Sequence, residues 1–122
     1  MKIILIDDDF DVRAFTSKML QSEGYEVFEA ENGSEGLQIM RDHVDEVDLV
    51  ITDIIMPDKE GIETIQELKR DYPDVRILAI SGGGKVHPEG YLGLAKAMGA
   101  NDTLSKPFIK QDLIDAVENA MS

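Results

Sequence analysis

The chain has 122 residues, of which 43% are apolar and 30% charged, so it is long enough to bury a core and too apolar for a disordered segment. Its 25 acidic and 12 basic residues give a formal net charge of −13, and such a surface repels nucleic-acid backbones and anionic lipid. The absence of cysteine excludes disulfides and thiolate metal sites. We therefore expect a globular domain that binds no nucleic acid directly and is compatible with the cytoplasm.

Short apolar runs typical of buried strands alternate with longer helical stretches along the chain. The first run, residues 3–6, passes directly into acidic residues and is too short for a signal sequence. No later apolar run is long enough to cross a bilayer, so we expect no membrane insertion. The other strand-like runs are residues 25–28, 48–52, 75–80 and 102–105.

Apolar residues at steps of three or four predict helices between these runs and indicate their core-facing sides. The clearest sets are Val12, Phe15 and Met19; Ile62, Ile65 and Leu68; and Leu113, Val117 and Met121. Five strands alternating with five helices are typical of an α/β protein whose parallel sheet is covered on both faces. In such sheets, ligands bind beyond the carboxyl ends of the strands.

Chemically active side chains follow four of the predicted strands. They are Asp7, Asp8 and Asp9 after the first strand, Asp53 after the third, Ser81 after the fourth and Lys106 after the fifth. Because the carboxyl ends of parallel strands share one edge of a sheet, we expect these groups to converge in one pocket.

Several carboxylates in one pocket repel one another unless a cation lies between them. Two of them about 4 Å apart repel by roughly 4 kcal/mol at an effective dielectric constant of 20. Mg²⁺, or Mn²⁺, suits such a site because it takes oxygen ligands and needs only one or two carboxylates. Asp53 can then attack phosphorus as a nucleophile, with Lys106 and the metal offsetting charge on the phosphoryl oxygens.

Two simpler interpretations of the acids remain open at this point. Asp8 or Asp9 can serve only to cap the first helix, a role in which Asp is favoured. An isolated Asp53 can also be a turn former at the strand end before Pro57. One cap needs only one acid, however, whereas the run supplies three, and Lys106 gives Asp53 a cationic partner from the last strand.

Four motifs together resemble the receiver domains of two-component response regulators: ILIDDD at residues 4–9, LVITDIIMP at residues 49–57, Ser81, and KPF at residues 106–108. Each motif alone is weak, but all four occur in order at the expected strand ends, and the resemblance covers essentially the whole chain. It implies a CheY-like, flavodoxin-like (βα)5 three-layer sandwich with a five-stranded parallel sheet in strand order 2-1-3-4-5. It also implies one receiver domain over residues 1–122, and we expect no output domain.

The resemblance further implies a set of metal ligands. Asp8 and Asp53 would bind Mg²⁺ directly, and Asp7 would reach it through water. The backbone carbonyl of Ile55 would supply another ligand.

The resemblance also implies roles in phosphorylation. Asp53 would be the phosphoacceptor, the Ser81 hydroxyl would turn toward the phosphoryl group on activation, and Lys106 would pair with that group. The bond between Lys106 and Pro107 is expected to be cis. Many receivers carry an aromatic residue two or three positions before this lysine, where the present chain has Thr103 and Leu104.

The function implied is that of a phosphorelay switch. A histidine kinase or a histidine phosphotransfer protein would donate the phosphoryl group, and the output would be altered binding to an unknown downstream protein. Such a domain catalyses only its own phosphorylation and dephosphorylation, so we do not expect an enzyme. The alternatives are a phosphatase of the haloacid dehalogenase type, for which Asp7 and Asp9 would form the D-x-D motif, and a non-phosphorylated pseudo-receiver that acts as an interaction module.

Overall fold

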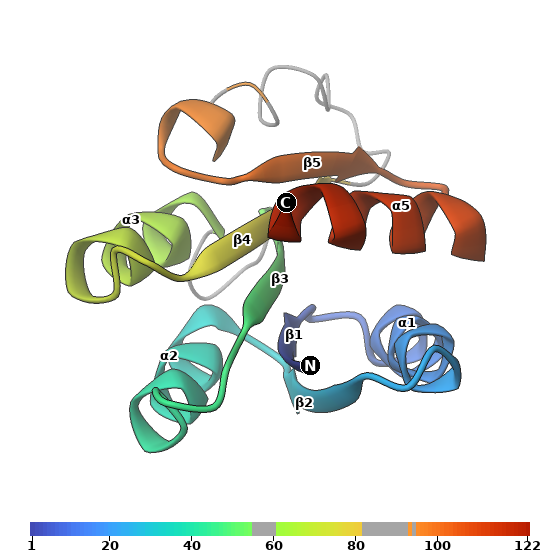
Figure 1. Ribbon diagram of the computed structural model, residues 1–122, viewed down its shortest axis with the longest axis horizontal. Helices are drawn as coiled ribbons and strands as arrows, with labels where there is room; N and C mark the ends of the chain where they lie inside the picture. The colour runs from blue at the N-terminus through green and yellow to red at the C-terminus, as the bar shows by residue number, and fades with distance from the viewer. Residues whose placement is uncertain (55–60, 82–92, 94) are drawn as a thin grey trace.

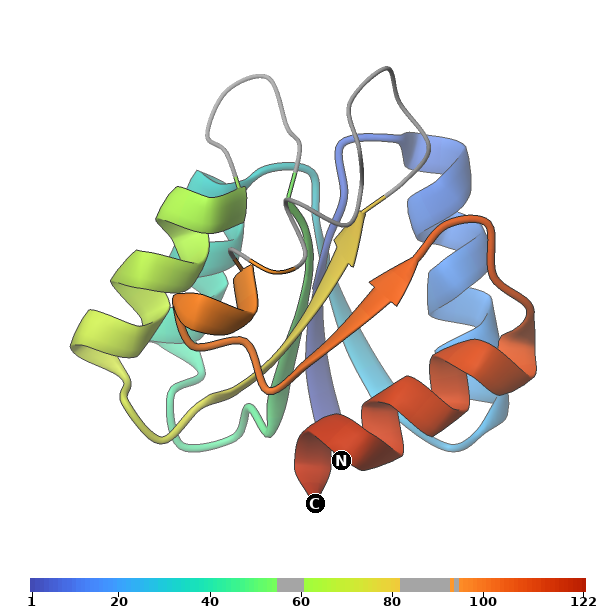
Figure 2. The ribbon, with the colours of Figure 1, turned by 90° about the horizontal axis from the view of Figure 1, so that it is seen from above.

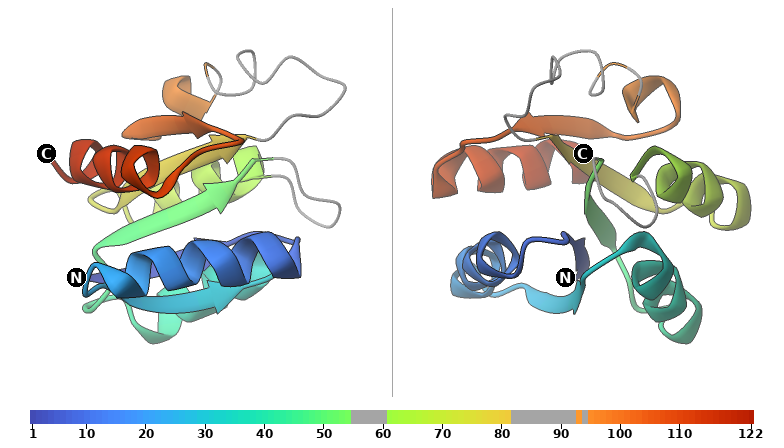
Figure 3. Two further views of the ribbon diagram at one scale, coloured as in Figure 1. Left: turned by 90° about the vertical axis from the view of Figure 1, so that its right-hand side faces the viewer. Right: turned by 180° about the vertical axis from the view of Figure 1, so that it is seen from behind.

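Five parallel strands form one sheet in the computed structural model, which describes residues 1–54, 61–81, 93 and 95–122. In spatial order the strands are β2 (Glu26–Ala30), β1 (Lys2–Ile6), β3 (Leu49–Asp53), β4 (Arg76–Ser81) and β5 (Asp102–Ser105). Their carboxyl ends point toward one end of the molecule, and both termini lie at the opposite end (Figures 2 and 3). The predicted fold class and the strand order 2-1-3-4-5 are confirmed.

Helices cover both faces of the sheet (Figure 1). On one face lie α1 (Phe10–Ser22) and α5 (Lys110–Met121), and on the other lie α2 (Gly33–Asp42) and α3 (Gly61–Asp71). Residues 93 and 95–97 are also helical, and the rest of the helix predicted between β4 and β5 lies outside the described residues. Within the described ranges, no helix has the length and apolar character needed to cross a membrane.

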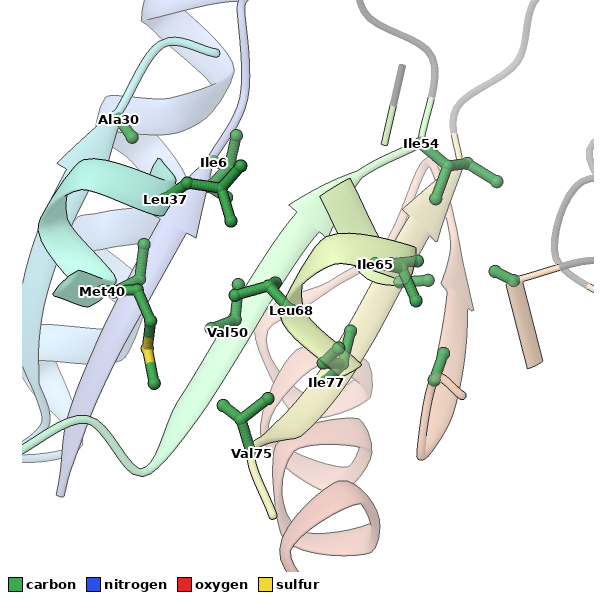
Figure 4. Packing of buried hydrophobic residues seen from close by; sticks show 14 residues of the cluster. Ile6, Ala30, Leu37, Met40, Val50, Ile54, Ile65, Leu68, Val75 and Ile77 are labelled. Atoms are coloured by element: carbon green, nitrogen blue, oxygen red, sulfur yellow. The ribbon is translucent and has the colours of Figure 1, made fainter. Parts of the chain in front are cut away.

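Side chains of each central strand alternate between two cores, one on each face of the sheet. In β1, Ile3 and Leu5 join the core under α1 and α5, whereas Ile4 and Ile6 join the core under α2 and α3. Figure 4 shows the second core, where Ile6 lies near Leu37 of α2. Because both faces are covered, these strands are apolar at nearly every position, and each fully buried aliphatic side chain contributes roughly 1.5–3 kcal/mol.

The predicted core face of α1 is wrong at Phe15, whose side chain is 65% exposed. The helix instead buries Thr16, Ser17, Met19 and Leu20. At about 100° per residue, these four positions form one face, and Phe15 lies beyond its edge. The segment from Phe15 to Met19 is helical, as its spacing predicts. Thr16 and Ser17, however, occupy the buried face where the Phe15 ring was expected.

Helix α3 begins at Gly61, directly against the strand end that carries Asp53. The Gly61 N–H donates to the Ile54 carbonyl at 3.1 Å, and a Cβ at this position would overlap the backbone of Asp53 and Ile54. We expect Gly61→Ala to lower the free energy of unfolding by about 2 kcal/mol, because the backbone must shift to admit the methyl group. Urea unfolding would measure this against Gly93→Ala, where an added Cβ meets no atom of the described residues within 4 Å. Equal losses of stability in the two variants would contradict the prediction.

Candidate functional site

Three acidic side chains meet at the carboxyl end of the sheet. Asp53 is the last residue of β3 and Asp7 follows β1, so the pairing of these two strands brings them together. Asp7 is 5% and Asp53 is 7% exposed, whereas Asp8 is exposed. One carboxylate oxygen from each of the three lies within 4.8 Å of the other two. The convergence of these predicted acids is therefore present in the fold.

Lys106, directly after β5, places its ammonium between two of these carboxylates. Its Nζ lies 2.9 Å from Oδ2 of Asp53 and 3.1 Å from Oδ2 of Asp7, with 20% of the side chain exposed. The Lys106 N–H also donates to the Ser81 carbonyl at 2.7 Å, which joins the ends of β4 and β5. The bond between Lys106 and Pro107 is cis, as predicted.

Burial and the neighbouring charges together set the pKa values of Asp7 and Lys106 in the pocket. Burial raises the pKa of the Asp7 carboxyl above its ordinary value, and the Asp9 N–H and the Lys106 ammonium offset only part of this rise. Burial by itself lowers the pKa of Lys106, but the hydrogen bond and charge of Asp53, with those of Asp7, outweigh it and leave that pKa raised. Lys106 is therefore cationic at neutral pH. Because the folded protein binds the Asp7 proton more tightly than the unfolded chain, ionisation of Asp7 lowers stability as the pH rises through its folded pKa.

Ser81 ends β4 beside this pocket, but its hydroxyl makes no hydrogen bond to the other groups of the site. The residue is 0% exposed, and among the described residues its Oγ has no hydrogen-bond partner. A buried hydroxyl without a partner costs free energy, roughly 1–3 kcal/mol, so this group is available for a new acceptor. Ile55, the predicted source of a backbone ligand, lies outside the described residues.

Arg13 of α1 contacts the acidic loop, although it was not among the residues predicted for the site. Its Nη1 donates to the Asp7 carbonyl at 2.7 Å, and its Nε donates to Oε1 of Glu29 in β2 at 3.2 Å. Only 11% of the Arg13 side chain is exposed. The only sequence feature that could have indicated this role is a basic residue four positions after the helix cap. That feature does not indicate that the Arg13 side chain can contact β2.

An apolar groove adjoins the acidic pocket on the α1 side. It has a volume of about 670 Å³ and is lined by Asp11, Val12, Phe15, Thr16, Met19, Lys106, Pro107 and Phe108. Lys106 therefore belongs to both the pocket and the groove. Ile109, which follows the groove residue Phe108, is 67% exposed. An exposed apolar surface of this kind is typical of a binding site.

The fold and the acidic pocket together define a flavodoxin-like α/β protein of the CheY class. Residues 3–118 match the family described as the response regulator receiver domain. The chain belongs to this family, whose members act in two-component systems as phosphoryl-accepting switches rather than as enzymes that turn over a metabolite.

Known relatives agree with this assignment. The transcriptional regulatory protein CpxR of Klebsiella pneumoniae is 34% identical over 113 residues, which are 93% of this chain and 46% of CpxR. The response regulator receiver protein CpdR of Brucella abortus is 32% identical over 122 residues, covering 98% of this chain and 96% of CpdR. A receiver domain protein from Clostridium thermocellum has a TM-score of 0.89 and 33% identity over 98% of this chain and 93% of its own. The chain thus spans about half the length of CpxR and nearly all of CpdR.

Proposed function

We propose that this chain is a phosphorylation switch in which Asp53 accepts a phosphoryl group from a phosphohistidine of a histidine kinase or a histidine phosphotransfer protein. The observation that carries the proposal is the position of the Asp53 carboxylate, which is nearly buried and lies 2.9 Å from the Lys106 ammonium. A strand-end turn former needs neither this burial nor a lysine from the last strand. Phosphorylation would then change the affinity of the domain for a downstream protein.

In the proposed reaction, a carboxylate oxygen of Asp53 attacks phosphorus. The new O–P bond replaces the P–N bond of the phosphohistidine, and the leaving imidazole takes up a proton. Lys106, already in contact with Asp53, would shift its hydrogen bond to a phosphoryl oxygen and offset the charge there. Burial of Asp53 strengthens this interaction because little water screens it.

The acids Asp7, Asp8 and Asp53 would hold Mg²⁺, or Mn²⁺ in its place. Their donor set fits, since three carboxylate oxygens from two neighbouring strand ends approach one another within 4.8 Å and such oxygens are the preferred ligands of these ions. The raised pKa of Asp7 also supports a metal site, because a bound cation would compensate the charge of this buried carboxylate. When bound, the metal would supply positive charge to the phosphoryl oxygens. The Ile55 carbonyl remains a predicted further ligand.

Ser81 would bind the phosphoryl group after transfer. Its Oγ is buried at the end of β4 and has no partner within the described part of the chain. A phosphoryl oxygen is a strong acceptor for such a hydroxyl. The gain from this hydrogen bond would be made only in the phosphorylated state, which is what a switch requires.

The phosphodonor would dock in the groove between α1 and residues 106–108. A donor must bring its histidine to Asp53, and the groove is continuous with that site through Lys106. Its exposed aromatic side chain, Phe15, suits the apolar face of a partner helix.

Phe15→Ala tests the docking surface. We expect phosphotransfer from a kinase that phosphorylates the wild-type chain to slow by about tenfold, because an exposed aromatic anchor is lost. Phosphorylation by acetyl phosphate, which needs no docking surface, should be unchanged. Val44→Ala removes an exposed apolar side chain away from the groove and serves as the matched control. A kinase rate equal to that of Val44→Ala would exclude Phe15 from the interface.

The two alternatives fit the pocket less well. In a haloacid dehalogenase-type site, Asp9 would need a free carboxylate, but its Oδ1 accepts a hydrogen bond from the Val12 N–H at 3.1 Å and caps α1. A pseudo-receiver that only binds other proteins does not require a lysine ammonium between two buried carboxylates.

The mass of the intact protein after incubation with acetyl phosphate and Mg²⁺, with an EDTA control, tests the proposal. One phosphoryl group should be added only when metal is present.

A further inference from the structure

In the described part of the chain, the Asp8 carboxylate has no polar contact that would fix its position. The side chain is exposed. It nevertheless reaches within 4.8 Å of oxygens on Asp7 and Asp53. Its position therefore depends on the backbone of the loop between β1 and α1.

Arg13 holds that backbone at one particular atom. Its Nη1 donates to the Asp7 carbonyl oxygen at 2.7 Å. This carbonyl belongs to the planar peptide group that joins Asp7 to Asp8. A hydrogen bond to it consequently restrains the rotation of that plane, and with it the direction in which the Asp8 side chain leaves the backbone.

Arg13 is itself held from three directions. Its Nε donates to Oε1 of Glu29 in β2 at 3.2 Å, its carbon stem rises from the first turns of α1, and its guanidinium lies over the Phe10 ring at 5.5 Å from the centroid. Only 11% of the side chain is exposed. The contact with Phe10 also gives a structural reason for an aromatic residue that is 68% exposed.

These contacts use the shape of arginine as well as its charge. The two donors, Nε and Nη1, point to different elements of the fold, one to β2 and one to the acidic loop. A planar guanidinium presents both donors in fixed relative positions, whereas a lysine ammonium is a single point on a flexible stem. Lysine at this position would keep the charge but could not hold both partners in the same geometry.

We propose that Arg13 is a positioning residue of the acidic site, which orients the peptide between Asp7 and Asp8 so that the Asp8 carboxylate can bind a divalent cation together with Asp53. The inference rests on the proposed metal site and adds a residue to its outer shell. Outer-shell partners of metal ligands typically change metal affinity by 10- to 100-fold when they are removed.

The test compares Arg13→Met with Lys18→Met, which removes one positive charge from an exposed position of the same helix. Two quantities are measured: the Mg²⁺ dissociation constant by calorimetry, and hydrogen exchange of the Asp9 amide without metal. That amide donates to Oδ1 of Asp7 at 2.9 Å and so reports on the loop directly. In Arg13→Met we expect affinity to fall and exchange to accelerate by about tenfold each. In Lys18→Met both should stay within about twofold of wild type.

Three results of this comparison decide whether Arg13 positions the acidic loop. A folded Arg13→Met protein that matches Lys18→Met in both quantities would overturn the proposal. If Arg13→Met fails to fold, Arg13→Lys takes its place, and wild-type values in that variant would reduce the role of Arg13 to its charge and likewise overturn the proposal. If the wild-type protein binds no Mg²⁺, the proposed metal site fails, and exchange at Asp9 still decides whether Arg13 orders the loop.

Discussion

Asp53→Asn should abolish phosphoryl transfer to the protein. The amide has nearly the shape of the carboxylate, so the β3 strand end and its packing are preserved. It lacks the anionic oxygen that attacks phosphorus, however, and a neutral amide is not a useful nucleophile. We expect wild-type protein incubated with acetyl phosphate and Mg²⁺ to gain one phosphoryl group in its intact mass, and Asp53→Asn to gain none.

Asp45→Asn is the matched control for this experiment. It makes the same chemical change at an exposed position in the connection between α2 and β3, with no hydrogen bond or ion pair in the described structure. It should be phosphorylated like wild type. Phosphorylation of Asp53→Asn at the wild-type rate would move the acceptor to another residue and remove the basis for the proposed switch.

Lys106→Met should lower the rate of phosphorylation by about 100-fold, the effect usually seen when one group that stabilises developing charge is lost. The methionine keeps most of the length of the stem but removes the ammonium from its places near Asp53 and Asp7. Asp53 remains present, so the reaction should slow rather than stop. The time course of the phosphoryl adduct, measured by quenching and mass analysis, gives the rate.

Lys110→Met separates this effect from a general loss of positive charge. Lys110 lies four residues further on and pairs with Glu23 at 3.0 Å on the surface, where an ion pair contributes little. We expect its phosphorylation rate to stay within about twofold of wild type. Equal rates in the Lys106 and Lys110 variants would show that the ammonium at the pocket has no part in the reaction.

Much of the fold could be predicted because it depends on local patterns. The predicted strand segments agree with all five strands to within two residues. Near-continuous apolar runs mark the central strands β1, β3 and β4, which are covered on both faces, whereas the edge strands β2 and β5 have a weaker, mixed pattern. The convergence of Asp7, Asp53 and Lys106 followed from their places at the ends of parallel strands. The strand order itself came from the resemblance to receiver domains, because no residue pattern specifies which strands are neighbours.

The remaining features depend on contacts between distant segments. The spacing of Phe15 and Met19 predicts that they are neighbours on one face of the helix. It does not predict how much of the helix surface is buried against the sheet. The role of Arg13 requires that Glu29 of the neighbouring strand and the Asp7 carbonyl lie on two sides of one guanidinium. Neither arrangement has a signature in a single sequence.

The proposed switch depends above all on which residue carries the phosphoryl group, and that residue can be identified chemically. Wild-type protein phosphorylated with acetyl phosphate and Mg²⁺ would be reduced with borohydride, which converts an aspartyl phosphate to homoserine, and then digested and sequenced by mass spectrometry. We expect homoserine at position 53 alone. Homoserine at another aspartate, or a phosphoryl adduct that borohydride leaves intact, would contradict this expectation.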